Sequence, residues 1–113
     1  MPRPEIGRPL PRGREAYVDE IKWLGYVLAD EGHGREWRRV FQAEAHQADA
    51  LWQAIASLAV SAPVTDLRPG SRGMGCAVHA ALTFGERTAH VVLAWLYDEP
   101  DDRPRLVSAY PSP

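Results

Sequence analysis

The chain has little cysteine and no long apolar run. Cys76 is the one cysteine among 113 residues, so no disulfide can form within the chain and no cysteine-based zinc framework exists. No stretch reaches the about 18 consecutive apolar residues that a transmembrane helix needs, and the N-terminus lacks the apolar segment of a signal peptide. We therefore expect a cytoplasmic protein that does not bind membranes.

Several cofactor and catalytic motifs are also absent. The glycine-rich segment 69–75 lacks the Gly-Lys-Ser/Thr ending of a phosphate-binding loop, and no serine has the glycine frame of a nucleophile elbow. The residues that could bind a metal show no pair at a characteristic ligand spacing. These residues are His33, His46, His79, His90 and Cys76. We therefore expect no metal and no cofactor.

Charge of one sign is not in excess either. The chain has 13 lysines and arginines, 15 aspartates and glutamates, and a formal net charge of -2. Nothing attracts the whole chain to nucleic acid or acidic membranes, so any anion site must be a local patch. The length suits one domain, and a hydrophobic content of 45% is ordinary for a globular protein.

Prolines and arginines crowd the first 14 residues, a composition that neither holds a helix nor builds a core. They are Pro2, Pro4, Pro9, Pro11, Arg3, Arg8, Arg12 and Arg14. We predict a flexible tail over residues 1–14, followed by one domain over residues 15–113. The tail is either a mobile solvated arm or a contact for a phosphate or an acidic partner.

Three segments then show helical periodicity. The first follows Asp19, which can cap it, and the others cover about residues 35–44 and 48–60 before Pro63. The apolar stripe expected on the first helix consists of Ile21, Leu24 and Leu28, widened by Trp23 and Val27.

The second half of the chain predicts strands. Alternating apolar residues or β-branched runs occupy residues 64–67, 76–84, 87–97 and 105–110, with turn-rich segments at 68–73 and 98–104. Consecutive strands with short links are antiparallel neighbours. The predicted fold is α+β, with two or three N-terminal helices packed on a roughly four-stranded antiparallel meander.

The last predicted strand sets two hydroxyl groups on one face. Residues two apart share a face of a strand, so Leu106, Ser108 and Tyr110 should point together, with Val107 and Ala109 on the other side. This face is either an ordinary solvated surface or part of a small binding or reactive site.

His33 lies between two glycines at the start of the second predicted helix. Histidine exchanges protons near neutral pH, and arginines hold phosphate through paired donors. His33 is therefore a candidate acid or base, and Arg35, Arg38 and Arg39 are candidate phosphate contacts. The alternative is a loop histidine beside a solvated basic helix face.

His79 and His90 lie on neighbouring predicted strands. If both point to the face that carries Ser108 and Tyr110, the sheet combines two imidazoles with two hydroxyls, a set suited to phosphodiester chemistry in RNA. The alternative is that both are ordinary exposed strand residues, because the sequence does not fix the register.

Three segments carry a resemblance to a known group of proteins. They are residues 18–28 (VDEIKWLGYVL), 32–41 (GHGREWRRVF) and 105–111 (RLVSAYP). They resemble an uncharacterised bacterial domain family found as stand-alone proteins and as C-terminal modules of polymorphic toxins. The order of helices before a meander is also similar to the barnase, EndoU, colicin and RelE group of ribonuclease toxins.

That resemblance implies a site between a helix and the terminal strand. Lys22, or His33 with Arg35, would match the helical side, and Ser108 and Tyr110 would match the strand side. Two features depart from the group: family members often have threonine in place of Ser108, and ribonuclease toxins tend to be basic, whereas this chain carries a charge of -2.

The leading hypothesis is thus a small toxin-like domain acting as a metal-independent ribonuclease. His33, with His79 or His90, would be the acid and base, and Arg35 would hold phosphate. The expected partners are RNA and a small antitoxin or immunity protein. The rival hypothesis is a non-catalytic interaction module that forms a homodimer by strand pairing at the sheet edge.

Overall fold

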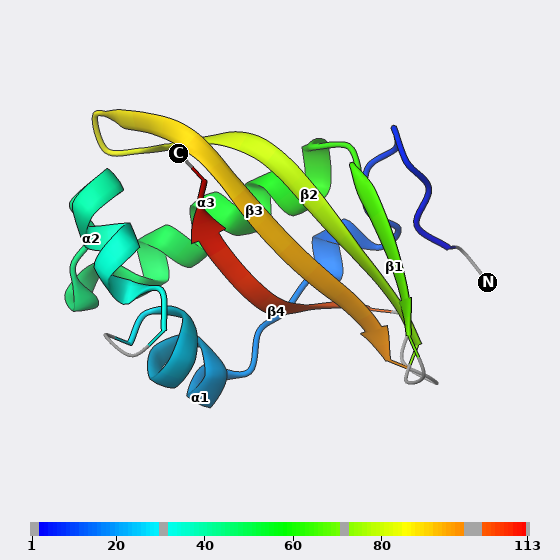
Figure 1. Ribbon diagram of the computed structural model, residues 1–113, viewed down its shortest axis with the longest axis horizontal. Coiled ribbons are helices and arrows are strands. Elements are labelled where there is room, and N and C mark those ends of the chain that lie inside the picture. Colours follow the sequence, from blue (N-terminus) through cyan, green and yellow to red (C-terminus); the bar gives the residue numbers. More distant parts are fainter. Residues whose placement is uncertain (1–2, 30–31, 71–72, 99–102, 113) are drawn as a thin grey trace.

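The computed structural model describes residues 3–29, 32–70, 73–98 and 103–112. Its sheet has the strand order β1-β2-β3-β4, with every neighbouring pair antiparallel. The strands are β1 (Asp66–Gly70), β2 (Gly73–Phe84), β3 (Arg87–Asp98) and β4 (Pro104–Pro111). The helical segments precede them in the chain (Figure 1). The predicted α+β fold with a four-stranded meander is confirmed.

The described helical segments are of three types, 3₁₀, π and α. They are η1 (Gly13–Glu15), α1 (Glu20–Lys22), η2 (Trp23–Val27), α2 (Gly34–Phe41), η3 (Ala45–Gln47) and α3 (Ala48–Ser61). In Figure 1, α3 runs behind the sheet, and α1 and α2 lie beside its β4 edge. Within the described ranges, no helix is both long and apolar enough to cross a membrane.

The first helical region begins as predicted and then changes type. The Asp19 carboxylate accepts hydrogen bonds from the backbone N–H groups of Ile21 and Lys22, which confirms the cap. The turn after it is π-helical, with Leu28 N–H bonded to the Trp23 carbonyl.

The π-helical turn changes which side chains are buried. Trp23 and Val27 are buried, whereas Ile21 and Leu24 are exposed, so the prediction that Ile21 and Leu24 face the core is wrong. Their stripe assumed 3.6 residues per turn, and the i to i+5 bond of a π-turn widens that spacing.

The other two helices match the predicted segments with one shift. α2 ends three residues before the predicted Glu44, because Gln42 adopts the left-handed conformation with φ 57°. α3 buries Leu51, Ile55 and Ala59 at four-residue intervals, as its periodicity predicted.

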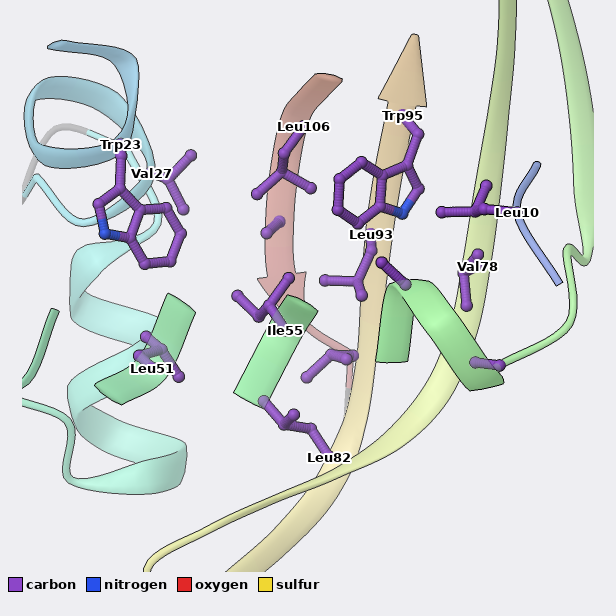
Figure 2. Close-up of a cluster of buried hydrophobic side chains, with 14 of the residues drawn as sticks. Leu10, Trp23, Val27, Leu51, Ile55, Val78, Leu82, Leu93, Trp95 and Leu106 are labelled. Atoms are coloured by element: carbon purple, nitrogen blue, oxygen red, sulfur yellow. The ribbon is translucent and has the colours of Figure 1, made fainter. Parts of the chain in front are cut away.

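The buried core lies between α3 and one face of the sheet. Cys76, Val78 and Leu82 of β2 point to this face and are almost fully buried, which confirms the alternation expected for β2. Figure 2 shows residues of β2, β3 and β4 meeting side chains of α3 and η2. The residues labelled there include Leu93, Trp95, Leu106, Ile55 and Val27.

The predicted loop over residues 68–73 is shorter than expected. β1 continues to Gly70, which pairs with Gly73. Gly73 has φ +148°, and a Cβ there would lie 2.0 Å from the Tyr97 carbonyl oxygen. A glycine is therefore required where β2 leaves the turn, and residues 71 and 72 lie outside the described part of the chain.

β4 does not alternate regularly. Ala94 pairs with Ser108, but Trp95 pairs with Leu106, so Val107 is an extra residue in a bulge. Leu106 and Ala109 are consequently both in the core. The prediction that Leu106 shares the face of Ser108 and Tyr110 is wrong, because a bulge reverses the alternation that follows it.

Residues 3–14 lie against the domain. Leu10 is buried in the core, Gly7 N–H bonds to the Val64 carbonyl, and the Tyr97 hydroxyl donates to the Pro11 carbonyl at 2.7 Å. A Cβ on Gly13 would lie 2.1 Å from the Ala59 carbonyl oxygen. The flexibility of this segment stays a prediction, but its composition gave no sign of these contacts.

We expect stability to fall in alkaline solution through Cys76 and Tyr97. Burial raises the pKa of the Cys76 thiol from 9.0 to about 12, and burial, followed by the charge of Cys76, also raises the pKa of Tyr97. A raised pKa means that the folded state holds its proton more tightly than the unfolded state. This contribution is complete below pH 9 and is lost as the pH rises toward 12.

Urea unfolding at several pH values between 7 and 11 measures this loss, and the Cys76→Ala variant should show a smaller alkaline decline. The native thiol should also react with an aromatic disulfide reagent far more slowly than the urea-unfolded chain. Equal reaction rates in the two states would contradict the buried position of Cys76.

Candidate functional site

The second face of the sheet points away from α3 and carries four of the five predicted catalytic residues, His79, His90, Ser108 and Tyr110. In Figure 1 this face is turned toward the viewer, and none of the described helices crosses it. The strand register places His79, Val92 and Tyr110 side by side in one row across β2, β3 and β4. We call this side of the sheet the open face.

His79 pairs with Asp66 at the edge of the open face. His79 Nε2 lies 3.2 Å from Asp66 Oδ2, and both side chains are about half exposed. Thr65, just before β1, is linked to β2 next to this pair. Its hydroxyl donates to the Ala77 carbonyl and accepts from His79 N–H. The imidazole is therefore both oriented and accessible.

Asp66 was not among the residues predicted from the sequence. Its role depends on the pairing of Asp66 with Ala77, two residues before His79 on β2. The only sequence signal is an acidic residue next to a predicted strand, which is too common to indicate a site.

His90 lies on the same face as His79. It pairs with Ala81 across β2 and β3, which makes it a diagonal neighbour of His79. In an antiparallel sheet such neighbours lie about 7–8 Å apart, within reach of a substrate that touches both. His79 and His90 therefore share one face of the sheet, as the two-imidazole arrangement requires.

Tyr110 is linked to His33 at the edge of the sheet. The two ring centroids lie 4.9 Å apart with an interplanar angle of 33°, although 77 residues separate them in the chain. The buried Trp37 indole N–H donates to the Ala109 carbonyl at 3.2 Å and holds α2 against β4. The structure thus places His33, from the predicted helical half of the site, against Tyr110 of the strand half.

His33 also has a carboxylate nearby and is less exposed than His79. Its Nδ1 lies 3.7 Å from Glu36 Oε1, and the His33 side chain is 25% exposed compared with 48% for His79. A partly covered ring in tilted contact with Tyr110 is better placed to position that residue than to transfer a proton to a bulky substrate.

Ser108 borders a floor of small side chains. It pairs with Ala94, which in turn pairs with Ala77 on β2. Ala77, Val92 and Ala94 are buried although they lie on the open face, so a substrate on this face would contact the imidazoles and hydroxyls around them.

The predicted basic contacts lie on the helices. Arg35, Arg38 and Arg39 are exposed residues of α2, and Lys22 is a half-buried residue of α1. His33, at the N-terminal end of α2, is the residue of this group that reaches the sheet. The arginines remain candidate contacts for a longer ligand that extends beyond the edge of β4.

Arg105 occupies the far end of the open face. Its guanidinium donates two hydrogen bonds to the Asp98 carboxylate, at 2.7 and 3.2 Å. The hydrogen bond to Asp98 raises the pKa of Arg105. This cation is already neutralised, so it contributes little net attraction for an anion.

The open face therefore holds two imidazoles, a carboxylate beside one of them, and two hydroxyls. Such a set can move protons and hold a polar group without help from a cofactor. In the described ranges, no three histidine, cysteine, aspartate or glutamate residues gather as a metal site would require.

Comparison with known proteins gives a family but no function. Residues 9–113 match the sequence profile of a domain of unknown function, DUF6883. No curated protein and no solved structure matches the chain.

Proposed function

Because the chain belongs to the DUF6883 family, whose function is unknown, we propose a function from the open face itself: metal-independent cleavage of RNA. The observation that carries this proposal is the arrangement of His79, His90 and Tyr110 around Val92 on three neighbouring strands. Two imidazoles that reach one substrate can serve as base and acid in a single reaction.

The Asp66 contact supports His79 as the base. When His79 Nε2–H donates to Asp66, the Nδ1 lone pair is left to accept a proton. His79 takes the proton of the ribose 2′-hydroxyl, and the 2′-oxygen forms a bond to phosphorus. The bond from phosphorus to the 5′-oxygen breaks, and His90, in its protonated form, gives that oxygen a proton. The products are a 2′,3′-cyclic phosphate and a free 5′-hydroxyl.

The remaining residues hold the substrate. The hydroxyls of Ser108 and Tyr110, on the β4 side of Val92, donate hydrogen bonds to phosphate oxygens. His33 keeps the Tyr110 ring in place through a tilted ring contact, and Arg35 extends the contact to a neighbouring phosphate. Because the net charge is -2, RNA binding depends on these local groups and weakens with added salt.

Incubation of the purified protein with total RNA at low salt, with and without EDTA, tests the proposal. We expect cleavage in both samples and products that end in 2′,3′-cyclic phosphate. A short RNA carrying a single 2′-deoxyribose at the cleaved position should resist, because the attacking hydroxyl is missing. Absence of cleavage, or cleavage that needs a divalent metal, would refute the proposed reaction.

A toxin-like role is part of the same proposal. Expression in a bacterium should slow growth, and the His79→Gln variant should restore it. A small inhibitor protein that covers the open face would then be the expected partner of the active form. Growth inhibition that persists in the variant would dissociate toxicity from this site.

The exposed apolar side chains of Ile21 and Leu24 favour a second candidate, a non-catalytic interaction module. These side chains are 83% and 50% exposed and lie next to each other on α1 and η2, as interface residues often do. Light scattering would show a mass of two chains if the partner is a second copy. A dimer together with inactivity toward RNA would favour this candidate.

A further inference from the structure

A pocket on the helical side of the molecule has no part in the proposed reaction. Its volume is about 290 Å³, just below the about 300 Å³ at which the usual range of ligand sites begins. Residues 16–18, α1, η2 and α3 contribute to its wall. It shares no residue with the open face.

Three aromatic residues line this pocket, of which Tyr17 and Trp52 are half-buried and Trp23 is buried. Trp23 and Trp52 meet edge to face with centroids 5.8 Å apart and an interplanar angle of 70°, and Tyr17 lines the wall beside them. Trp52 also lies next to the buried Trp95 ring, with the two ring centroids 6.4 Å apart. Because Trp52 is held between two other indoles, the aromatic wall is formed before any ligand arrives.

The charges on the pocket wall are both negative. Glu20 of α1 and Asp49 of α3 line it, and both are exposed. The described wall includes no lysine, arginine or histidine. Aromatic rings attract a cation to their faces, and carboxylates add Coulomb attraction.

The surroundings contain an example of this type of contact. The Arg103 guanidinium carbon lies 4.6 Å from the centroid of the Tyr17 ring. This ring therefore shows that an aromatic face near the pocket holds a guanidinium, but that face of Tyr17 is occupied by the chain itself.

We propose that this pocket binds a small organic cation, an alkylated ammonium compound of the size of choline. The half-buried Trp52 indole contacts the alkyl groups, and Glu20 and Asp49 balance the charge. An alkylated ammonium suits the site better than a metal ion, because two exposed carboxylates beside indoles provide too few oxygen ligands.

Titration with choline at constant ionic strength tests this assignment. We expect saturable shifts of the indole N–H signals of Trp23 and Trp52 in NMR spectra, while the signal of Trp37, bonded to Ala109, stays in place. The uncharged isostere 3,3-dimethyl-1-butanol should bind at least about five-fold more weakly, because it lacks the charge that the rings and carboxylates attract.

Variants separate charge from shape. The double change Glu20→Gln and Asp49→Asn keeps side-chain size and should weaken choline binding about five-fold or more, whereas Glu86→Gln in the β2–β3 turn should leave it unchanged. A thermal unfolding scan checks that each variant is folded. Equal binding of choline and its isostere, or no saturable shift, would overturn the assignment.

A second arm identifies the source of the ammonium group. An acetylated trimethyllysine amide presents the same group on a peptide side chain. Weaker or equal binding of this compound supports a free small cation, and binding more than ten-fold tighter than choline would overturn that choice. None of these measurements depends on RNA cleavage, so a failure of choline binding and a failure of the proposed ribonuclease activity can be distinguished.

Discussion

The variant His79→Gln is expected to cleave RNA about 10²–10⁴-fold more slowly than the wild type, the range that general acid or base catalysis contributes. Glutamine keeps the polarity and much of the length of histidine but cannot exchange a proton near neutral pH. His90→Gln should cost a similar factor. Initial rates on a short RNA with a single cleavage site measure both effects.

The double variant of His79 and His90 tests whether the two imidazoles act in one reaction. When two residues act in the same reaction step, removal of either one already removes most of their joint contribution to the rate. The double variant should therefore be little slower than either single variant. The wild-type rate should also show a bell-shaped dependence on pH, because one imidazole must be neutral and the other protonated. If the rate loss of the double variant equals the product of the two single losses, the two imidazoles do not act in one reaction.

His46 provides a matched control for His79. Its Nδ1 lies 3.3 Å from Glu44 Oε2, so it also pairs with a carboxylate, and its side chain is 74% exposed. It belongs to η3, away from the open face. His46→Gln should leave cleavage unchanged, and a loss comparable to that of His79→Gln would show that the effect is not specific to the sheet.

Replacement of His33 decides between its two roles. If His33 positions Tyr110 through the ring contact, then His33→Phe should retain much of the activity that His33→Ala loses, because a phenyl ring can also pack against a phenol. If His33 is the acid or base that the sequence suggested, both variants should be equally inactive.

The largest expected loss of stability follows from Trp37→Ala. Trp37 is fully buried, stacks on Phe41 with centroids 5.5 Å apart, and bonds through its indole to the Ala109 carbonyl. Truncation of a buried tryptophan costs about 3–5 kcal/mol, a large part of the about 5–15 kcal/mol that stabilises a domain. Urea unfolding followed by circular dichroism measures this loss.

Two further variants make the Trp37 result specific. Trp37→Phe keeps an aromatic ring but removes the hydrogen bond, which leaves the Ala109 carbonyl without its donor and should cost about 1–3 kcal/mol. Ile21→Ala, at an 83% exposed site, should change the unfolding free energy by no more than about 0.5 kcal/mol. A loss below about 1 kcal/mol for Trp37→Ala would show that α2 is not anchored to β4 in this way.

The two largest predictions are connected through β4. Ala109, which accepts the Trp37 bond, lies between Ser108 and Tyr110, and Tyr110 contacts His33 at the start of α2. A loose α2 would therefore disturb the open face as well as the core. Trp37→Phe is therefore expected to lower activity by shifting β4. Its KM should change more than its kcat, because the shift disturbs substrate positioning.

Local patterns in the sequence were sufficient for the type and order of the main elements. The alternation of Cys76, Val78 and Leu82 predicted β2 and its buried face, and the four-residue repeat of Leu51, Ile55 and Ala59 predicted α3. These patterns reflect burial of one side of each element, a property that nearby residues encode by themselves. The Asp19 cap was predictable for the same reason, since its bonds reach only two and three residues along the chain.

Contacts between distant residues were decided only by the tertiary structure. The register that sets Asp66 beside His79, the bulge at Val107, and the contact of His33 with Tyr110 each depend on how elements pack. A shift of one residue in strand pairing would move a side chain to the other face, and no local pattern excludes such a shift. The sequence by itself thus determined an α+β meander carrying histidines and hydroxyls, and packing determined which of them share a surface.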